Sequence, residues 1–262
     1  MTTINLLAIN LGVVFLLTTA LWAVSVAVKD SSIVDIFWGS GFVVIGWVSF
    51  AVADGAPGRR WLLAILTTLW GLRLTIHLAR RNLGHGEDFR YQEMRAKAGA
   101  SWPLRSLWAV FWAQGILMWL VSLPVQVGQQ GDTASGWSWL VIAGIIVFAV
   151  GLFFETVGDL QLTRFIADPA NKGTVMDRGL WRYTRHPNYF GEILLWIGVA
   201  IIAVPALQGW QWVALISPVF VTLLLTKVSG VPLLEKKSDS KWGGQEDYED
   251  YKKNTPVLVP KL

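Results

Sequence analysis

The chain has 262 residues, of which 53% are hydrophobic, only 15% are charged and 16 are tryptophan. This is too much apolar surface for a soluble core of this size, so we expect a protein that resides in a lipid bilayer. The modest formal net charge of +4 indicates no nucleic-acid partner, and the absence of cysteine excludes disulfides, thiolate metal ligands and a cysteine nucleophile.

Seven apolar runs are long enough to cross a bilayer, which takes about 20 residues of helix. In chain order they cover residues 4–28, 32–53, 60–79, 104–127, 137–157, 189–205 and 209–226. The first run is too long for the core of a signal peptide and has no basic segment before it, so we interpret it as a helix of the mature chain. The small residues of "GSGFVVIG" at 39–46 predict close helix packing.

These runs predict an all-α integral membrane protein, a bundle of seven transmembrane helices that forms a single domain over 1–262. Lys and Arg gather in the connections at about 80–103 and 158–188 and in the tail at 227–262. Such loops face the cytosol, so we expect the N-terminus outside and the C-terminus in the cytosol. A multi-pass protein of a bacterial inner membrane is the expected setting, with membrane lipids as its surroundings.

Ionisable side chains also occur inside the predicted spans, where burying a charge is costly and usually serves a function. They are Asp35, Arg73, His77, Glu155 and Glu192. With the predicted topology all five lie near the cytosolic third, which predicts a polar cavity open to the cytosol below an apolar part. Structural alternatives stay open: Asp35 and Arg73 form an ion pair, His77 is a satisfied core residue, and Glu155 with Asp159 marks a solvated helix end.

A polar stretch at 155–192 carries more charge than the orientation bias requires. Its polar residues are Asp159, Arg164, Asp168, Asn171, Asp177, Arg178, Arg182, Arg185, His186, Asn188 and Glu192. Arg offers planar, bidentate donors to phosphate, Asp and Glu accept from ribose hydroxyls, and Asn complements a carboxamide. Pro187 favours an extended residue before it, so Asn188 and Glu192 should share one face of the first turn of the sixth span. The stretch predicts a site for a phosphorylated dinucleotide at the membrane mouth.

The segment "RGLWRYTRHPNYFGE", with "ETVGDLQL" before it, resembles the C-terminal region of the steroid 5α-reductase family, membrane enone reductases that use NADPH. The stretches "IVDIFWGSGF" and "WGLRLTIHLARRNLGHGEDFRYQEMR" resemble the uncharacterised bacterial branch of that superfamily. The resemblance implies NADPH as cofactor and no metal, with Asp159, Asn188 and Glu192 as cofactor contacts and Arg164 and Arg178 near its phosphates. The full set of predicted cofactor-binding residues is Glu155, Asp159, Arg164, Asn171, Arg178, Arg182, Arg185, His186, Asn188, Tyr189, Glu192, Glu235, Tyr248 and Tyr251.

The resemblance also implies a Glu on the second span and a Tyr on the third that hydrogen-bond the 3-keto oxygen of the substrate. Asp35 and Trp70 are the nearest candidates here, with Arg73 beside them, and the Tyr is missing. Hydride transfer to the β-carbon of an enone develops negative charge on the carbonyl oxygen, which donors stabilise. Asp35 donates if burial keeps it neutral, whereas an Asp35 ionised against Arg73 leaves the role to Arg73 or His77.

We therefore expect an NADPH-dependent reductase that acts on a lipophilic substrate of the 3-oxo-Δ4-steroid class, which enters from the bilayer. One chain of seven spans is enough to enclose such a site, so a monomer suffices. The Arg-His-Pro motif and the tail also resemble isoprenylcysteine carboxyl methyltransferases, which use S-adenosylmethionine. A third reading is a membrane protein without catalysis, whose Arg-rich loops contact anionic lipids.

Overall fold

The computed structural model describes residues 1–131 and 138–261, and these residues form helices and no strands. Seven helical runs are long and apolar enough to cross a membrane: Thr3–Val28, Ile33–Val52, Pro57–Asn82, Phe89–Val121, Trp139–Ala167, Pro187–Ala206 and Gly209–Trp242. The predicted all-α, seven-span membrane fold is therefore confirmed. Several of these helical runs are longer than the predicted apolar segments. Pro57–Asn82 and Trp139–Ala167, for example, extend beyond 60–79 and 137–157 at their C-terminal ends, where charged residues follow in the same helix. Residue 137 of the predicted fifth run and residue 262 of the tail lie outside the described residues.

The chain divides into two compact units, which are described separately. Unit 1 comprises Met1–Ser138 and Ile202–Ala214, and unit 2 comprises Trp139–Ile201 and Leu215–Leu262. The polar stretch at 155–192 belongs to unit 2, whereas Asp35, Trp70 and Arg73 belong to unit 1. The expectation of a single domain stays a prediction.

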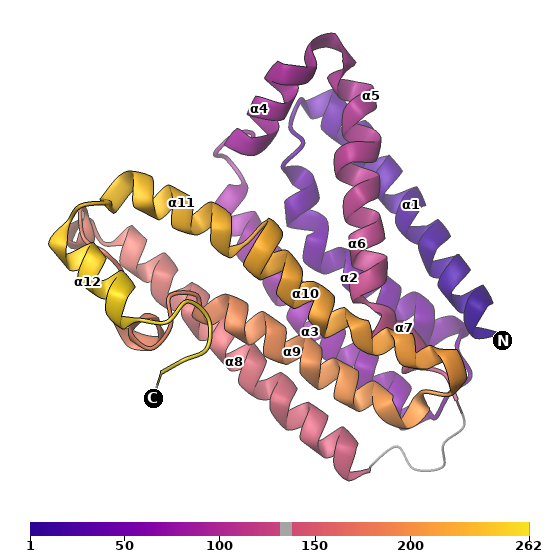
Figure 1. Ribbon diagram of the computed structural model, residues 1–262. Coiled ribbons are helices and arrows are strands. Elements are labelled where there is room, and N and C mark those ends of the chain that lie inside the picture. Colours follow the sequence, from indigo (N-terminus) through magenta and orange to yellow (C-terminus); the bar gives the residue numbers. More distant parts are fainter. Residues whose placement is uncertain (132–137, 262) are drawn as a thin grey trace. The chain divides into compact units, whose positions relative to one another are not determined.

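The helices of unit 1 meet through small residues. They are α1 Thr3–Val28, α2 Ile33–Val52, α3 Pro57–Asn82, α4 Phe89–Ala98, α5 Trp102–Ser106, α6 Ala113–Val121 and α7 Leu123–Val127, with a π-helical turn at Leu107–Trp112 (Figure 1). A Cβ atom on Gly39 of α2 would lie 2.2 Å from the carbonyl oxygen of Gly71 of α3. The two helices can approach this closely only without side chains at this crossing, which confirms the predicted packing role of "GSGFVVIG".

The turn between α1 and α2 is tied to the segment before α4. The Ser31 N–H donates to Glu87 Oε1 at 2.8 Å, and Arg95 donates to both Glu87 oxygens at 2.8 and 2.9 Å. Burial opposes ionisation of Glu87, but these hydrogen bonds outweigh it and hold the pKa of Glu87 below its ordinary value. Asp88 caps α4 by accepting from the Arg90 N–H at 3.0 Å. These contacts fix the start of α4 relative to α2.

Unit 2 is built on the pair α8 and α9, which lie side by side in Figure 1. Its helices are α8 Trp139–Ala167, α9 Pro187–Ala203, α10 Ile216–Leu223, α11 Val231–Trp242 and α12 Glu246–Asn254. The last two residues of α9, Ile202 and Ala203, belong to unit 1. A Cβ atom on Gly191 of α9 would lie 2.4 Å from the backbone nitrogen of Glu155 of α8. This close approach brings the polar end of α8 against the first turns of α9.

Helix α9 begins at Pro187, as the sequence predicts, because proline suits the first position of a helix. The segment before it is held by the C-terminal tail. The Arg185 N–H donates to the Pro256 carbonyl at 2.9 Å, and the Lys261 N–H donates to the Tyr183 carbonyl at 2.9 Å. The Thr184 hydroxyl donates to the Leu258 carbonyl at 2.8 Å. The tail thus positions the residues that lead into the site.

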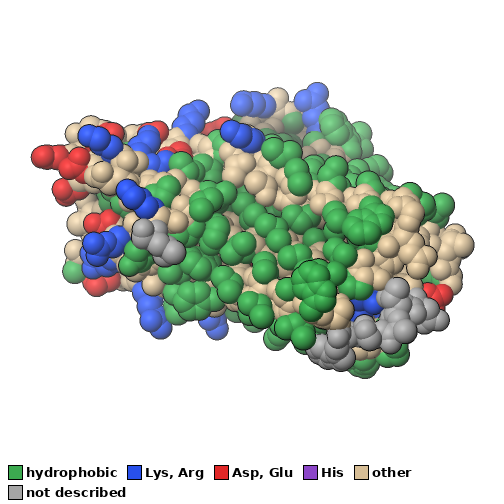
Figure 2. All heavy atoms as spheres, turned by 60° about the horizontal axis from the view of Figure 1, so that its bottom comes forward, with side chains coloured by type: hydrophobic (Ala, Val, Ile, Leu, Met, Phe, Trp, Pro, Cys, Tyr) green, Lys and Arg blue, Asp and Glu red, His purple; other side chains and the backbone are tan. Residues whose placement is uncertain are grey.

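On the face of unit 2 drawn in Figure 2, apolar side chains cover the helices and charged side chains gather toward the end that carries α12. The exposed apolar residues include Ile142, Ile146 and Phe153 of α8 and Ile216 and Val219 of α10. Such a band suits contact with lipid, as expected for helices that cross a membrane.

Candidate functional site

The first part of the candidate site lies where α8 meets α9. Asn188 donates from Nδ2 to Asp159 Oδ1 at 3.0 Å, and both side chains belong to the predicted cofactor set. Glu155 lies one turn before Asp159 on α8 and is buried, and Glu192 lies one turn after Asn188 on α9. Asn188 Oδ1 is buried and has no hydrogen-bond partner among the described residues. The junction of α8 and α9 thus holds one buried amide oxygen that is not satisfied by the described residues.

The second part joins α11 to the segment before α9. Arg185 pairs with Glu235 through Nε to Oε1 and Nη2 to Oε2, both at 3.1 Å. His186 Nε2 lies 2.9 Å from the same Oε1. Arg185 also donates to the carbonyls of Lys252 and Thr255 at the end of α12. One arginine therefore connects the segment before α9 with α11 and α12.

Around this ion pair lies a cavity of about 500 Å³, here called the large cavity, which falls within the usual size range of ligand sites. Its aromatic wall consists of Phe165, Trp181, Trp242, Tyr248 and Tyr251. Arg185, His186 and Glu235 line it as well. Burial raises the pKa of Tyr251, so its phenol stays protonated and donates to the Trp181 carbonyl at 2.6 Å.

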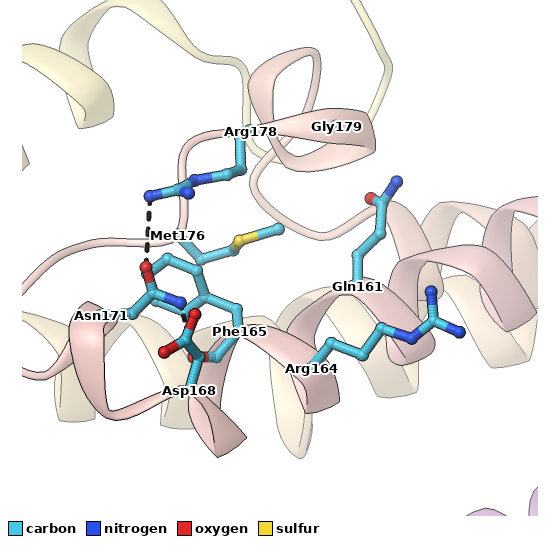
Figure 3. A pocket seen from close by; sticks show the side chains of 8 residues that line it. All are labelled: Gln161, Arg164, Phe165, Asp168, Asn171, Met176, Arg178 and Gly179. Atoms are coloured by element: carbon cyan, nitrogen blue, oxygen red, sulfur yellow. Dashed lines mark hydrogen bonds between the residues drawn. The ribbon is translucent and has the colours of Figure 1, made fainter.

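A smaller basic pocket of about 300 Å³ adjoins the large cavity and shares four of its lining residues, Phe165, Asp168, Asn171 and Met176. Figure 3 shows Arg164 on α8 and Arg178 on the following loop, with their guanidinium groups well separated. Arg178 lies over the Phe165 ring at 5.2 Å and approaches Asn171 Oδ1 at 3.4 Å. Arg164 is exposed and forms no ion pair with the described residues. This pocket offers cationic donors to an anion.

Two further predicted residues lie at the edge of these features. Tyr189 stacks on His186 with ring centroids 5.5 Å apart and the planes at 14°. Arg182 is exposed and lines neither cavity. Apart from Arg182 and Tyr189, the predicted cofactor residues thus divide into the α8 and α9 pair, the large cavity and the basic pocket.

In unit 1, the structure surrounds Asp35 with hydrogen-bond donors. Arg90 Nη2 donates to Oδ2 at 2.7 Å, and the Tyr91 hydroxyl donates to Oδ1 at 2.7 Å. Gln114 Nε2 lies 3.2 Å from Oδ1 and 3.1 Å from the Tyr91 oxygen. Asp35 thus accepts hydrogen bonds from three side chains, one of them the cation of Arg90.

The other two predicted catalytic residues lie on α3. Trp70 is buried and packs edge-on against Phe42 of α2, with ring centroids 5.2 Å apart. Arg73 follows one turn later and is half-buried. Among the described residues, Arg90 of α4 forms an ion pair with Asp35.

Sequence reasoning missed the donors that gather on Asp35 and part of the wall of the large cavity. Arg90 and Tyr91 lie more than fifty residues from Asp35, and no spacing rule connects them. Their only signal is the Asp88 cap, which predicts that a helix starts there. Trp181 and Phe165 are apolar, so a search for polar groups passes over them.

Comparison with known proteins gives a family and several distant relatives. DUF1295, described as a protein of unknown function, matches residues 21–255. An uncharacterised protein of Schizosaccharomyces pombe is 27% identical over 81% of this chain and 70% of its own length. A steroid 5-alpha-reductase of Gossypium hirsutum is 26% identical over 47% of this chain and 42% of its own length. A Ustilaginoidea virens protein named "Probable O-methyltransferase" is 36% identical over 25% of this chain and 23% of its own length.

No solved structure matches the chain. The matched segment spans less than half the length of the steroid reductase. The family match, in contrast, covers most of the chain and includes both units. The chain therefore belongs to the DUF1295 family, and its resemblance to the steroid 5α-reductases is confirmed at the level of the superfamily.

Proposed function

We propose that the chain is a membrane oxidoreductase that uses NADPH to reduce the carbon–carbon double bond of an enone in a lipophilic substrate. The substrate class is that of 3-oxo-Δ4-steroids, and the substrate reaches the protein from the bilayer. The similarity to a steroid 5-alpha-reductase supports the reaction class. The observation that carries the cofactor proposal is the basic pocket beside the large cavity in unit 2.

The basic pocket suits the additional phosphate that distinguishes NADPH from NADH. Arginine binds phosphate through two parallel N–H groups, and Arg178 is already oriented by Phe165 and Asn171. Arg164 forms no ion pair with the described residues, so its donors are available to a ligand. The additional phosphate of NADPH can accept charge-assisted hydrogen bonds from these arginines. NADH has no phosphate at that position and forms no such bonds.

At the substrate end, we extend the proposal to Tyr91. Its hydroxyl is the phenolic donor that the third span lacks, and Asp35 with Gln114 holds it in place. When the enone accepts hydride, negative charge develops on its oxygen, and a fixed hydroxyl can stabilise that charge. In this proposal the Tyr91 hydroxyl turns its single hydrogen from Asp35 to the substrate oxygen, while Gln114 continues to donate to the phenolic oxygen and Asp35 keeps Arg90 and Gln114 as donors.

Thermal unfolding of the detergent-purified protein tests the cofactor proposal. A ligand that binds only the folded state stabilises it by about 2.7 kcal/mol at a hundredfold excess over its Kd. We expect NADPH to raise the unfolding temperature more than NADH, and the double substitution Arg164→Gln with Arg178→Gln to remove that difference. Arg105→Gln is the matched control, because Arg105 is exposed and lines neither cavity. Equal effects of NADPH and NADH on the wild type would refute the proposal.

A second candidate is a membrane methyltransferase of the isoprenylcysteine carboxyl type that uses S-adenosylmethionine. The similarity over 66 residues to the protein named "Probable O-methyltransferase" favours it. The same unfolding experiment separates the two, because stabilisation by S-adenosylmethionine alone would support methyl transfer. NADPH oxidation that depends on an added 3-oxo-Δ4-steroid would support the reductase.

A further inference from the structure

The helix α4, which connects α3 with α5, supplies two of the three donors to Asp35 (Figure 1). Arg90 and Tyr91 belong to α4, and Gln114 belongs to α6. These three residues together with Asp35 are here called the Asp35 cluster. A movement of α4 as a whole would take Arg90 and Tyr91 away from Asp35 and leave Gln114 beside it.

Glycines with positive φ flank α4 on both sides. Gly86 before the helix has φ +76°, and Gly99 directly after it has φ +57°, conformations that glycine adopts without steric cost. A Cβ atom on either glycine would meet no described atom within 4 Å other than its chain neighbours. Connections of this kind can absorb the changes in φ and ψ that a hinge movement requires. Both ends of α4 therefore have the freedom and the space to act as hinges.

Hydrogen bonds hold the start of α4 against the turn between α1 and α2. Three of them, here called the latch, run from the Ser31 N–H to Glu87, from the Asp88 N–H to the Ser32 hydroxyl and from Arg95 to the Lys29 carbonyl. Arg95 also donates to both oxygens of Glu87, although its side chain is 34% exposed. Water can replace hydrogen bonds at such an exposed edge, so the latch can break at moderate cost.

The apolar contact of α4 with the rest of unit 1 is small. Tyr91 is the buried residue of this helix, and its ring packs in a cluster with Val34, Trp102, Val110 and Phe111. The other large apolar side chains of α4, at positions 89 and 94, are exposed. A segment with few buried side chains and many exposed hydrogen bonds opens at a lower free energy than the helices around it. One ring and the latch thus keep α4 closed.

We propose that α4 is a hinged lid of the Asp35 cluster, which closes when the latch forms and opens as one body when the latch breaks. In the open state water reaches Asp35 and Gln114, and in the closed state α4 excludes it. The lid concerns unit 1 alone and goes beyond the proposed function. In the proposed reductase, closure of the lid would bring the Tyr91 hydroxyl to the substrate and keep water from the reaction.

The absence of cysteine from the chain provides a clean test, because one substitution introduces a single thiol. Val34→Cys places it beneath α4, at a position with no exposed surface beside Tyr91. Ile45→Cys is the matched position, because it is equally buried on the same helix and lies outside the Tyr91 cluster. Cysteine behaves as a small hydrophobic residue at such sites. A water-soluble maleimide should reach the first thiol when α4 opens and the second only when the protein unfolds more widely.

We expect the maleimide to label Val34→Cys at least tenfold faster than Ile45→Cys in the detergent-purified full chain. Adding Arg95→Gln removes charge-assisted hydrogen bonds of the latch, so labelling of Val34→Cys should become about tenfold faster and that of Ile45→Cys should not change. Lys97→Gln, an exposed position of the same helix, is the control and should change neither rate. The lid is refuted if Arg95→Gln leaves the rate at Val34→Cys unchanged or raises both rates equally.

Hydrogen exchange of the wild type gives a decision that needs no substitution. The N–H groups of Ser31 and Asp88 lie in different segments, and both donate across the latch. If α4 opens as one body, both amides should exchange with the same free energy of opening, and unequal protection would overturn the lid. Neither measurement uses NADPH or a substrate, so a failure of the lid and a failure of the proposed function are separate results.

Discussion

The Arg185 ion pair allows a quantitative prediction about unit 2. Substitution Arg185→Met removes both contacts with Glu235 and the donors to the carbonyls of Lys252 and Thr255. Removing one partner from a fully buried pair costs about 3–5 kcal/mol. The side chains of Arg185 and Glu235 are 11% and 19% exposed, and Glu235 keeps its contact with His186. We therefore expect a loss below that range, about 2–3 kcal/mol.

For a chain of this size, each 1 kcal/mol changes Tm by about 2–4 °C, so Arg185→Met should lower Tm by about 4–12 °C. The assay is thermal unfolding in detergent, monitored by intrinsic tryptophan fluorescence. Lys252→Met is the control, because it removes a cation of α12 whose pair with Asp239 is 33% and 46% exposed and is therefore screened by solvent. The reasoning fails if Arg185→Met lowers Tm no more than Lys252→Met does.

Three further predictions concern the helix crossing, the substrate end and the effect of pH. Gly191→Ala should lower Tm strongly because its Cβ would meet the α8 backbone at 2.4 Å, whereas Gly12→Ala, with open space around it, should leave Tm nearly unchanged; equal effects would contradict the close crossing. Tyr91→Phe should reduce kcat for enone reduction by about 10²–10³-fold with NADPH affinity retained, and an unchanged kcat would exclude Tyr91 as the donor. The depressed pKa of Glu87 means that its stabilisation is present above its unfolded value near 4.5 and is lost as pH falls through the folded pKa. The Tm of Glu87→Gln should therefore lie below that of the wild type at neutral pH, and this difference should shrink in acid; a constant difference would contradict the assigned role of the Arg95 contact.

The spans and their contacts through small residues could be predicted from the sequence. In a bilayer the backbone must satisfy its own hydrogen bonds, so an apolar run of sufficient length forms a helix whatever lies beside it. The same holds for the start of α9 at Pro187, which follows from the fixed φ and missing N–H of proline. The glycines at 39–46 likewise indicate close packing before the partner helix is known.

The partners of the polar side chains could not be predicted in this way. Among the charges inside the spans, Arg73 is the obvious partner for Asp35, yet the structure brings Arg90 and Tyr91 to it from α4. Neither residue lies within an apolar run. They follow Asp35 by 55 and 56 residues, and helical periodicity relates only residues within the same helix. The position of α4 depends on Glu87, Ser31 and the Asp88 cap, which are contacts of the folded state.

The sequence by itself determined which segments enter the membrane and which residue types gather at 155–192, because hydropathy and proline chemistry act locally. Only the tertiary structure decided that Glu235, 49 residues further along, contacts both Arg185 and His186 in the segment before α9. The physical reason is that a hydrogen bond is directional and needs its two atoms within about 3 Å, a condition that residue type and spacing do not determine for segments far apart in the chain.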